Sequence, residues 1–148
     1  MDLNQDYMLQ RMQSLWLLIA GACGLLTLKY SFFSGNKMSG DQTKTFQFLT
    51  ATTSIIILIL TVAMISALLI DIFLYKNRKL QLRIVLASLL VSILNVYLYF
   101  RETKKFVEGE GNYDLTCVLA LAIPILLILA ATGIYKDQKL VKSLDRLR

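Results

Sequence analysis

The sequence FQFLTATTSIIILILTVAMISALLI, from Phe46 to Ile70, contains 25 residues and no charge. In lipid every backbone N–H and C=O group must be paired within its own segment, so an apolar stretch of this length predicts a transmembrane helix. At about 1.5 Å per residue such a helix exceeds the roughly 30 Å hydrocarbon core of a bilayer. The sequence therefore predicts a membrane span at 46–70.

Three further apolar stretches flank this span, and charged residues delimit each of them. They cover residues 12–28, 84–100 and 115–135. Lys and Arg at helix ends can extend their charges to the membrane surface, which makes even 17 residues sufficient. We expect a single all-α domain over residues 1–148: a polytopic integral membrane protein with a four-helix transmembrane bundle and an amphipathic tail at 136–148.

The composition excludes several classes of protein. Of the 148 residues, 56% are hydrophobic and 18% are charged, which is too apolar for an ordinary soluble domain or a disordered chain. The sequence contains no histidine, the usual ligand of haem and zinc and the commonest general base. It also lacks a phosphate-binding glycine loop and a nucleophile elbow. We expect no enzyme activity, no cofactor and no metal.

The distribution of Lys and Arg predicts the orientation in the membrane. Ten of the 16 basic residues lie in the N-terminal tail, the 71–83 connection and the C-terminal tail, and six lie in the other two connections. Because cytoplasmic segments carry the excess of Lys and Arg, both termini are expected in the cytoplasm. The net charge of +6 then fits anionic headgroups, and we expect no nucleic-acid partner.

Asp71 directly follows the predicted span at 46–70, and because the apolar stretch continues over residues 72–75, Asp71 is the one acidic residue embedded among the spans. Ionisable groups in a membrane are costly and are candidates for function. Arg11 and Arg83 are expected at the same depth, so Asp71 is interpreted as part of an interhelical ion pair or as solvated by headgroup water. A proton or cation relay is the alternative.

The third span carries a polar stripe. Ser88, Ser92, Asn95 and Tyr99 follow the spacing i, i+4, i+7 and i+11, which places them on one face of a helix. The preceding span offers five possible partners: Thr50, Thr53, Ser54, Thr61 and Ser66. The stripe is interpreted as interhelical hydrogen bonding, with the lining of a path for a polar solute as the alternative.

The predicted cytoplasmic face offers contacts for lipid or for partner proteins. These candidates are Lys76, Arg78, Lys79, Lys139, Leu140, Lys142, Leu144 and Arg146. In the tail, apolar residues form a stripe on a basic helix, a pattern typical of helices on a membrane surface or a partner. The 101–114 connection, with its glycines, is expected to be a flexible loop.

Three strings at this face resemble a known family: MLQRMQSLWLL (8–18), FLYKNRKLQLRI (73–84) and IYKDQKLVKSLDRLR (134–148). They are similar to small four-span membrane proteins from Bacteroidota that are catalogued as a domain of unknown function. The resemblance implies an inner-membrane location and four helices, and it implies no activity, substrate or catalytic residue.

These observations favour a non-catalytic accessory, structural or assembly subunit of a larger inner-membrane complex. Such a protein would contact anionic lipid and other inner-membrane proteins through its helix faces and basic cytoplasmic rim. The alternative is a small oligomeric transporter or channel for a polar solute.

Overall fold

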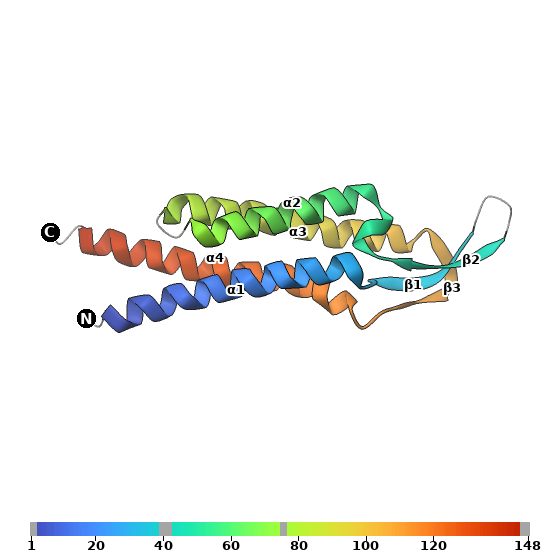
Figure 1. The fold of residues 1–148 in the computed structure, drawn as a ribbon, viewed down its shortest axis with the longest axis horizontal. Helices are drawn as coiled ribbons and strands as arrows, with labels where there is room; N and C mark the ends of the chain where they lie inside the picture. The colour runs from blue at the N-terminus through green and yellow to red at the C-terminus, as the bar shows by residue number, and fades with distance from the viewer. Residues whose placement is uncertain (1–2, 39–42, 75–76, 146–148) are drawn as a thin grey trace.

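Four helices run side by side along the long axis of the protein, and a small sheet lies at one end of them (Figure 1). The computed structural model describes residues 3–38, 43–74 and 77–145, and the side chains within 12–38, 43–74 and 77–139. The helices are α1 (Leu3–Lys29), α2 (Ile55–Phe73), α3 (Arg78–Thr103) and α4 (Cys117–Asp145). We call the end with the sheet the sheet end, and the end where α2 finishes and α3 begins the turn end.

All four helices are long and apolar enough to cross a membrane, as the sequence predicts. The main contacts join α1 to α2 and α4, and α3 to α2 and α4, so the helices enclose a common core. The core consists of Leu17, Ala20, Cys23, Met64, Leu68, Val85, Ile123, Leu127, Ala130, Ala131 and Ile134. Helix α4 continues into the predicted tail as far as Asp145.

The prediction of an all-α fold is wrong in one respect, because the structure also contains a three-stranded sheet. Its strands are β1 (Phe33–Met38), β2 (Lys44–Leu49) and β3 (Phe106–Tyr113). The strand order is β2-β1-β3, and both pairings are antiparallel. Strand β3 occupies the connection that was expected to be a flexible loop.

The predicted second span is also wrong at its start, since α2 begins at Ile55 and not at residue 46. Phe46 and Phe48 alternate with a polar residue and belong to β2, as the period of a strand requires. The Thr50 N–H donates to the Thr53 hydroxyl over 3.0 Å, and that hydroxyl donates to the Phe48 carbonyl over 3.1 Å. The first of these bonds is part of the capping box of a short 3-10 helix, Ala51–Thr53, which separates β2 from α2.

A glycine pair lets the sheet close around an aromatic side chain. Gly35 of β1 lies opposite Gly111 of β3. A Cβ atom at Gly111 would lie 2.4 Å from Cζ of Phe33, and one at Gly35 would lie 2.7 Å from the Gly111 Cα. The Phe33 ring lies 5.1 Å from the ring of Phe106 and 5.1 Å from that of Tyr113. A larger residue at Gly111 would displace this ring, and one at Gly35 would displace the backbone of β3.

Aromatic stacking and hydrogen bonds attach the sheet to the helices. Phe32 stacks on Tyr99 of α3 with a centroid distance of 4.7 Å. Just before α4, Asp114 accepts hydrogen bonds from the hydroxyls of Ser31 and Ser34, the latter at 2.9 Å. The Asp114 N–H donates to the Phe32 carbonyl over 3.2 Å. The position of the sheet is therefore set by both α3 and α4.

Glu110 connects all three strands. It accepts hydrogen bonds from Lys44 of β2 and from Asn36 of β1, the latter at 3.0 Å. The bond from Lys44, followed by that from Asn36, lowers the pKa of the Glu110 carboxyl below its ordinary value. An unfolded glutamate titrates at about pH 4.3. The stabilisation of the fold by the ionised Glu110 carboxylate is therefore complete above that pH, and it is lost as the pH falls through the lowered folded pKa.

We therefore expect Glu110→Gln to weaken the sheet at pH 7 and to have no such effect in acid. Amide hydrogen exchange of β1 and β3, compared between wild type and variant at each pH, measures this. The difference in protection should be present at pH 7, should begin to shrink below about pH 4.3 and should disappear once the pH lies below the lowered folded pKa. A difference that persists unchanged in acid would contradict the role of the ionised carboxylate.

Candidate functional site

The buried face of α3 is polar over most of its length. Six of its residues are at most 5% exposed, and their spacing alternates between four and three, as in a heptad repeat: Gln81, Val85, Ser88, Ser92, Asn95 and Tyr99. The structure therefore places all four residues of the predicted stripe on one inward face. Gln81 adds a further polar group at the turn end that the sequence interpretation did not include.

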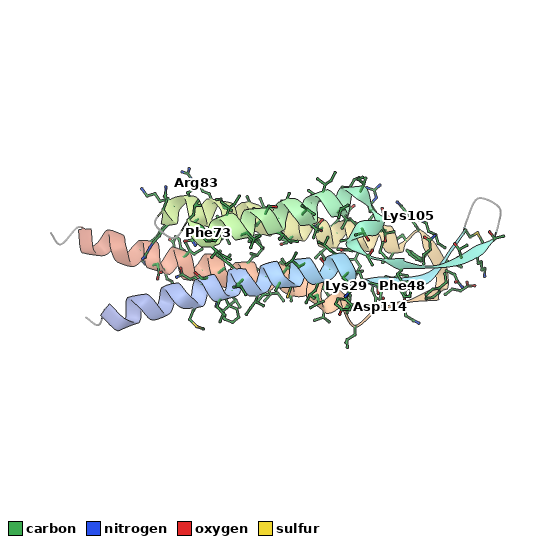
Figure 2. The ribbon with its side chains drawn as sticks, in the orientation of Figure 1. Lys29, Phe48, Phe73, Arg83, Lys105 and Asp114 are labelled. Atoms are coloured by element: carbon green, nitrogen blue, oxygen red, sulfur yellow. The ribbon has the colours of Figure 1, made fainter. Side chains whose placement is uncertain are left out.

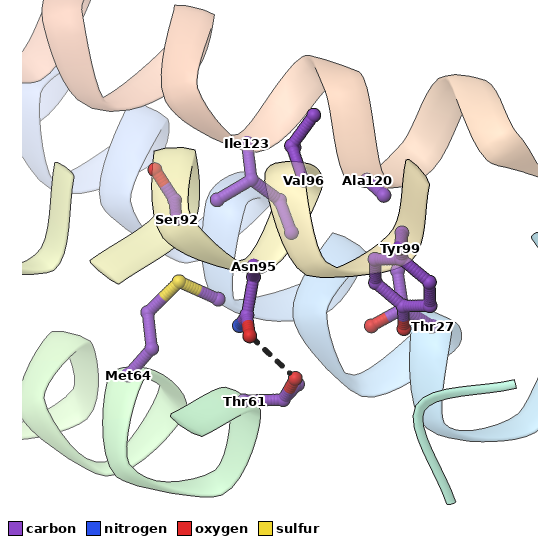
Figure 3. A pocket seen from close by; sticks show the side chains of 9 residues that line it. All are labelled: Thr27, Thr61, Met64, Ser92, Asn95, Val96, Tyr99, Ala120 and Ile123. Atoms are coloured by element: carbon purple, nitrogen blue, oxygen red, sulfur yellow. Dashed lines mark hydrogen bonds between the residues drawn. The ribbon is translucent and has the colours of Figure 1, made fainter. Parts of the chain in front are cut away.

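Asn95 of this stripe makes a hydrogen bond that joins two helices. The Asn95 Nδ2 donates to the Thr61 hydroxyl of α2 over 3.2 Å (Figure 3). The Thr61 hydroxyl donates in turn to the Ile57 carbonyl over 2.7 Å. Ser66, another of the predicted partners, is exposed and donates to the Val62 carbonyl within its own helix. Contacts of this kind stabilise membrane helix pairs by about 0.6 kcal/mol.

A cavity of about 10 Å³ lies beside Asn95. The side chains that border it come from all four helices (Figure 3): Thr27, Thr61, Met64, Ser92, Asn95, Val96, Tyr99, Ala120 and Ile123. The Asn95 Oδ1 is buried and has no hydrogen-bond partner in the described part of the chain. The Ser88 hydroxyl, one turn before Ser92 on α3, is likewise buried and has no hydrogen-bond partner among the described residues.

Asp71 is fully buried near the turn end of α2, and the predicted pair with Arg83 is wrong. Arg83 is exposed on α3 and lies on the outside of the bundle (Figure 2). Among the side chains that the structure describes, none bonds to either carboxylate oxygen of Asp71. The Asp71 backbone carbonyl accepts a hydrogen bond from Gln81 Nε2 over 3.4 Å. The Arg11 side chain lies outside the described residues.

A second buried acid, which the sequence interpretation missed, does have partners. Asp137 of α4 is 4% exposed and accepts a hydrogen bond of 2.7 Å from Gln13 Nε2 of α1. The Arg78 guanidinium of α3 lies 3.6 Å from the same carboxylate oxygen. Gly133, four residues before Asp137, permits this contact, because a Cβ atom there would lie 2.9 Å from Gln13 Cγ.

Signals for this cluster were present in the sequence. Gln13 is a polar residue in a charge-free stretch, and Gly133 and Asp137 share a helix face. What the sequence did not contain was the pairing of α1 with α4 across 124 residues. Arg78, predicted as a lipid or partner contact, is part of this internal ion pair.

The predicted basic rim is only partly described. Lys79 and Lys139 are exposed at the turn end. The other predicted contacts lie outside the described side chains: Lys76, Leu140, Lys142, Leu144 and Arg146. The described part of the chain holds no group of three or more His, Cys, Asp or Glu residues placed to bind a metal ion.

An exposed aromatic pair lies at the sheet end, where the sequence interpretation expected membrane. Phe46 and Phe48 of the edge strand β2 are 61% and 59% exposed. Their rings contact each other edge to face with a centroid distance of 5.2 Å. Strand β2 extends away from the ends of the helices, and Phe48 lies on the part of the strand nearer to them (Figures 1 and 2).

Comparison with known proteins identifies one family. A family model described as "Domain of unknown function (DUF4293)" matches residues 9–147. No curated protein and no solved structure matches the chain.

Proposed function

The chain belongs to the DUF4293 family, and we propose that it is a non-catalytic accessory subunit of a larger complex in the inner membrane. In this proposal both termini face the cytoplasm, since the turn end carries the excess of basic residues. The sheet end then lies on the opposite side of the membrane. Anionic lipid headgroups contact the basic turn end.

The observation that carries the proposal is the exposed pair Phe46 and Phe48. On a transmembrane helix an exposed apolar side chain faces lipid, but these two rings belong to a strand of the sheet. Exposed aromatic clusters outside a membrane are typical of protein contacts, and aromatic residues contribute much of the energy of such interfaces. The proposed partner surface is therefore the outer face of β2, in addition to the helix faces.

The geometry of β2 disfavours a pairing of β2 with β2 between two copies of this chain. One edge of β2 is occupied by β1, so the β2 strands of two copies can pair only through the same remaining edge. Identical edges pair antiparallel, about a two-fold axis perpendicular to the strands. Because the strands run along the long axis of the bundle, that axis would invert one copy relative to the membrane (Figure 1).

The alternative function, transport of a polar solute, has weaker support. The polar face of α3 borders a cavity of about 10 Å³, which is close to the space needed by one water molecule. A larger solute does not fit this conformation. We therefore propose the accessory role ahead of transport.

Purification from native membranes in mild detergent tests the accessory role. We expect the tagged protein to recover a partner in fixed stoichiometry, and the double variant Phe46→Ser and Phe48→Ser to lose it. Truncation of a central interface aromatic costs about 2 kcal/mol, roughly thirty-fold in affinity.

Phe73 provides the matched control, because it is a phenylalanine 77% exposed at the opposite end of the protein (Figure 2). Phe73→Ser should retain the partner. The proposal fails if the wild-type protein migrates alone as a monomer under these conditions.

A further inference from the structure

The cavity beside Asn95 is bordered by more hydrogen-bond acceptors than donors. The Asn95 Nδ2 is used in the bond to Thr61, while its Oδ1 is unpartnered in the described part of the chain. The hydroxyls of Thr61, Ser92 and Thr27 each donate to a carbonyl of their own helix, over 2.7 Å in every case. Their oxygen lone pairs remain available to accept. A ligand of this cavity must therefore be a donor.

We infer that one water molecule is bound in this cavity and donates hydrogen bonds to Asn95 Oδ1 and to a hydroxyl oxygen of the wall. The size agrees, because a water needs roughly 10 to 15 Å³ of such space and the cavity measures about 10 Å³. Water brings two donor hydrogens, which the wall lacks.

The absence of charge among the side chains that border the cavity argues against a bound cation. The side chains that border the cavity are all uncharged. A cation buried in a membrane without a counter-charge is expensive. Asp71, the buried acid on α2, lies ten residues from Thr61, about 15 Å along the helix. A neutral donor therefore fits this cavity better than an ion.

The bound water gives the polar stripe of α3 a structural role. It connects Asn95 to the neighbouring helices in the half of the bundle nearer the sheet end. The side-chain bond to Thr61 alone leaves the Asn95 amide oxygen without a partner in the described part of the chain. Buried waters characteristically satisfy such groups and are costly to remove. This inference is independent of the accessory role, since it concerns the interior of the bundle.

Methyl NMR of the full-length protein in detergent micelles tests the inference. Met64 and Ile123 border the cavity and are 2% and 4% exposed, so bulk water does not reach their methyl groups. We expect cross-peaks between water and both methyl groups in the wild type. Asn95→Leu, which removes the acceptor and fills the space, should abolish them. Ser66→Ala, which removes an exposed hydroxyl from α2, should retain them.

Two results would overturn the inference. Wild-type protein without these cross-peaks would show a dry cavity, and this measurement decides the matter even if Asn95→Leu does not fold. A thermal midpoint that rises in sodium chloride relative to choline chloride, in the wild type but not in Asn95→Leu, would show a cation site instead.

Discussion

Asp137→Ala should lower the free energy of unfolding by about 2 to 4 kcal/mol. The substitution leaves Gln13, which is 6% exposed, without its acceptor at 2.7 Å. It also removes the charge partner of Arg78 at 3.6 Å. The side chain of Arg78 is 32% exposed and can recover part of its hydration, which limits the loss. Unfolding by SDS titration in mixed micelles measures the change.

One variant separates the hydrogen bond from the charge, and a second variant is the control. Asp137→Asn keeps an oxygen acceptor for Gln13 and removes only the charge, so we expect it to cost less than Asp137→Ala. Lys136→Ala alters the exposed neighbouring residue and should stay within about 0.5 kcal/mol of wild type. An Asp137→Ala protein as stable as wild type would contradict the role of the cluster in joining α1, α3 and α4.

Asp71→Val should have the opposite effect and raise the free energy of unfolding by about 1 to 3 kcal/mol. The Asp71 side chain is fully buried, and both carboxylate oxygens lack a partner among the described side chains. A buried polar group without hydrogen bonds is destabilising, and an apolar residue of similar size removes that cost. The same SDS titration measures the gain.

Asp71→Asn is the matched control, because it keeps the size and polarity and removes only the ionisable group. We expect it to lie between wild type and Asp71→Val. A loss of more than about 1 kcal/mol in Asp71→Val would mean that a donor holds the carboxylate. If partner recovery falls in a more stable Asp71→Val protein, the carboxylate serves function at the expense of stability.

Much of the fold could be predicted from the sequence, because long charge-free stretches are rare outside membranes. The four helices and the inward face of α3 follow from the spacing of charges and from helical periodicity. The sheet could not be predicted in this way, since its strands are short and β1 pairs with β3 some 75 residues further along the chain. For this reason the sequence interpretation assigned Phe46 and Phe48 to the beginning of a membrane span, although they belong to strand β2.

The candidate site was predicted less completely than the fold. The residues of the α3 stripe were identified, but the partner of Asp71 was inferred from depth in the membrane alone. Depth does not specify the direction in which a side chain leaves its helix, and Arg83 lies on the exposed side of α3. The partners of Asp137 depend on the packing of α1 against α4, which local sequence does not encode.

The sequence by itself determined that four helices of this chain are apolar enough for a membrane, because the cost of placing charge and unpaired backbone in lipid depends on local composition. Only the tertiary structure decided which buried polar groups meet. Asp137 contacts Gln13 and Arg78, whereas the Asp71 carboxylate has no partner among the described side chains. The physical reason is that a hydrogen bond requires its two atoms to lie within about 3 Å of each other, and that distance depends on how the helices are rotated against each other.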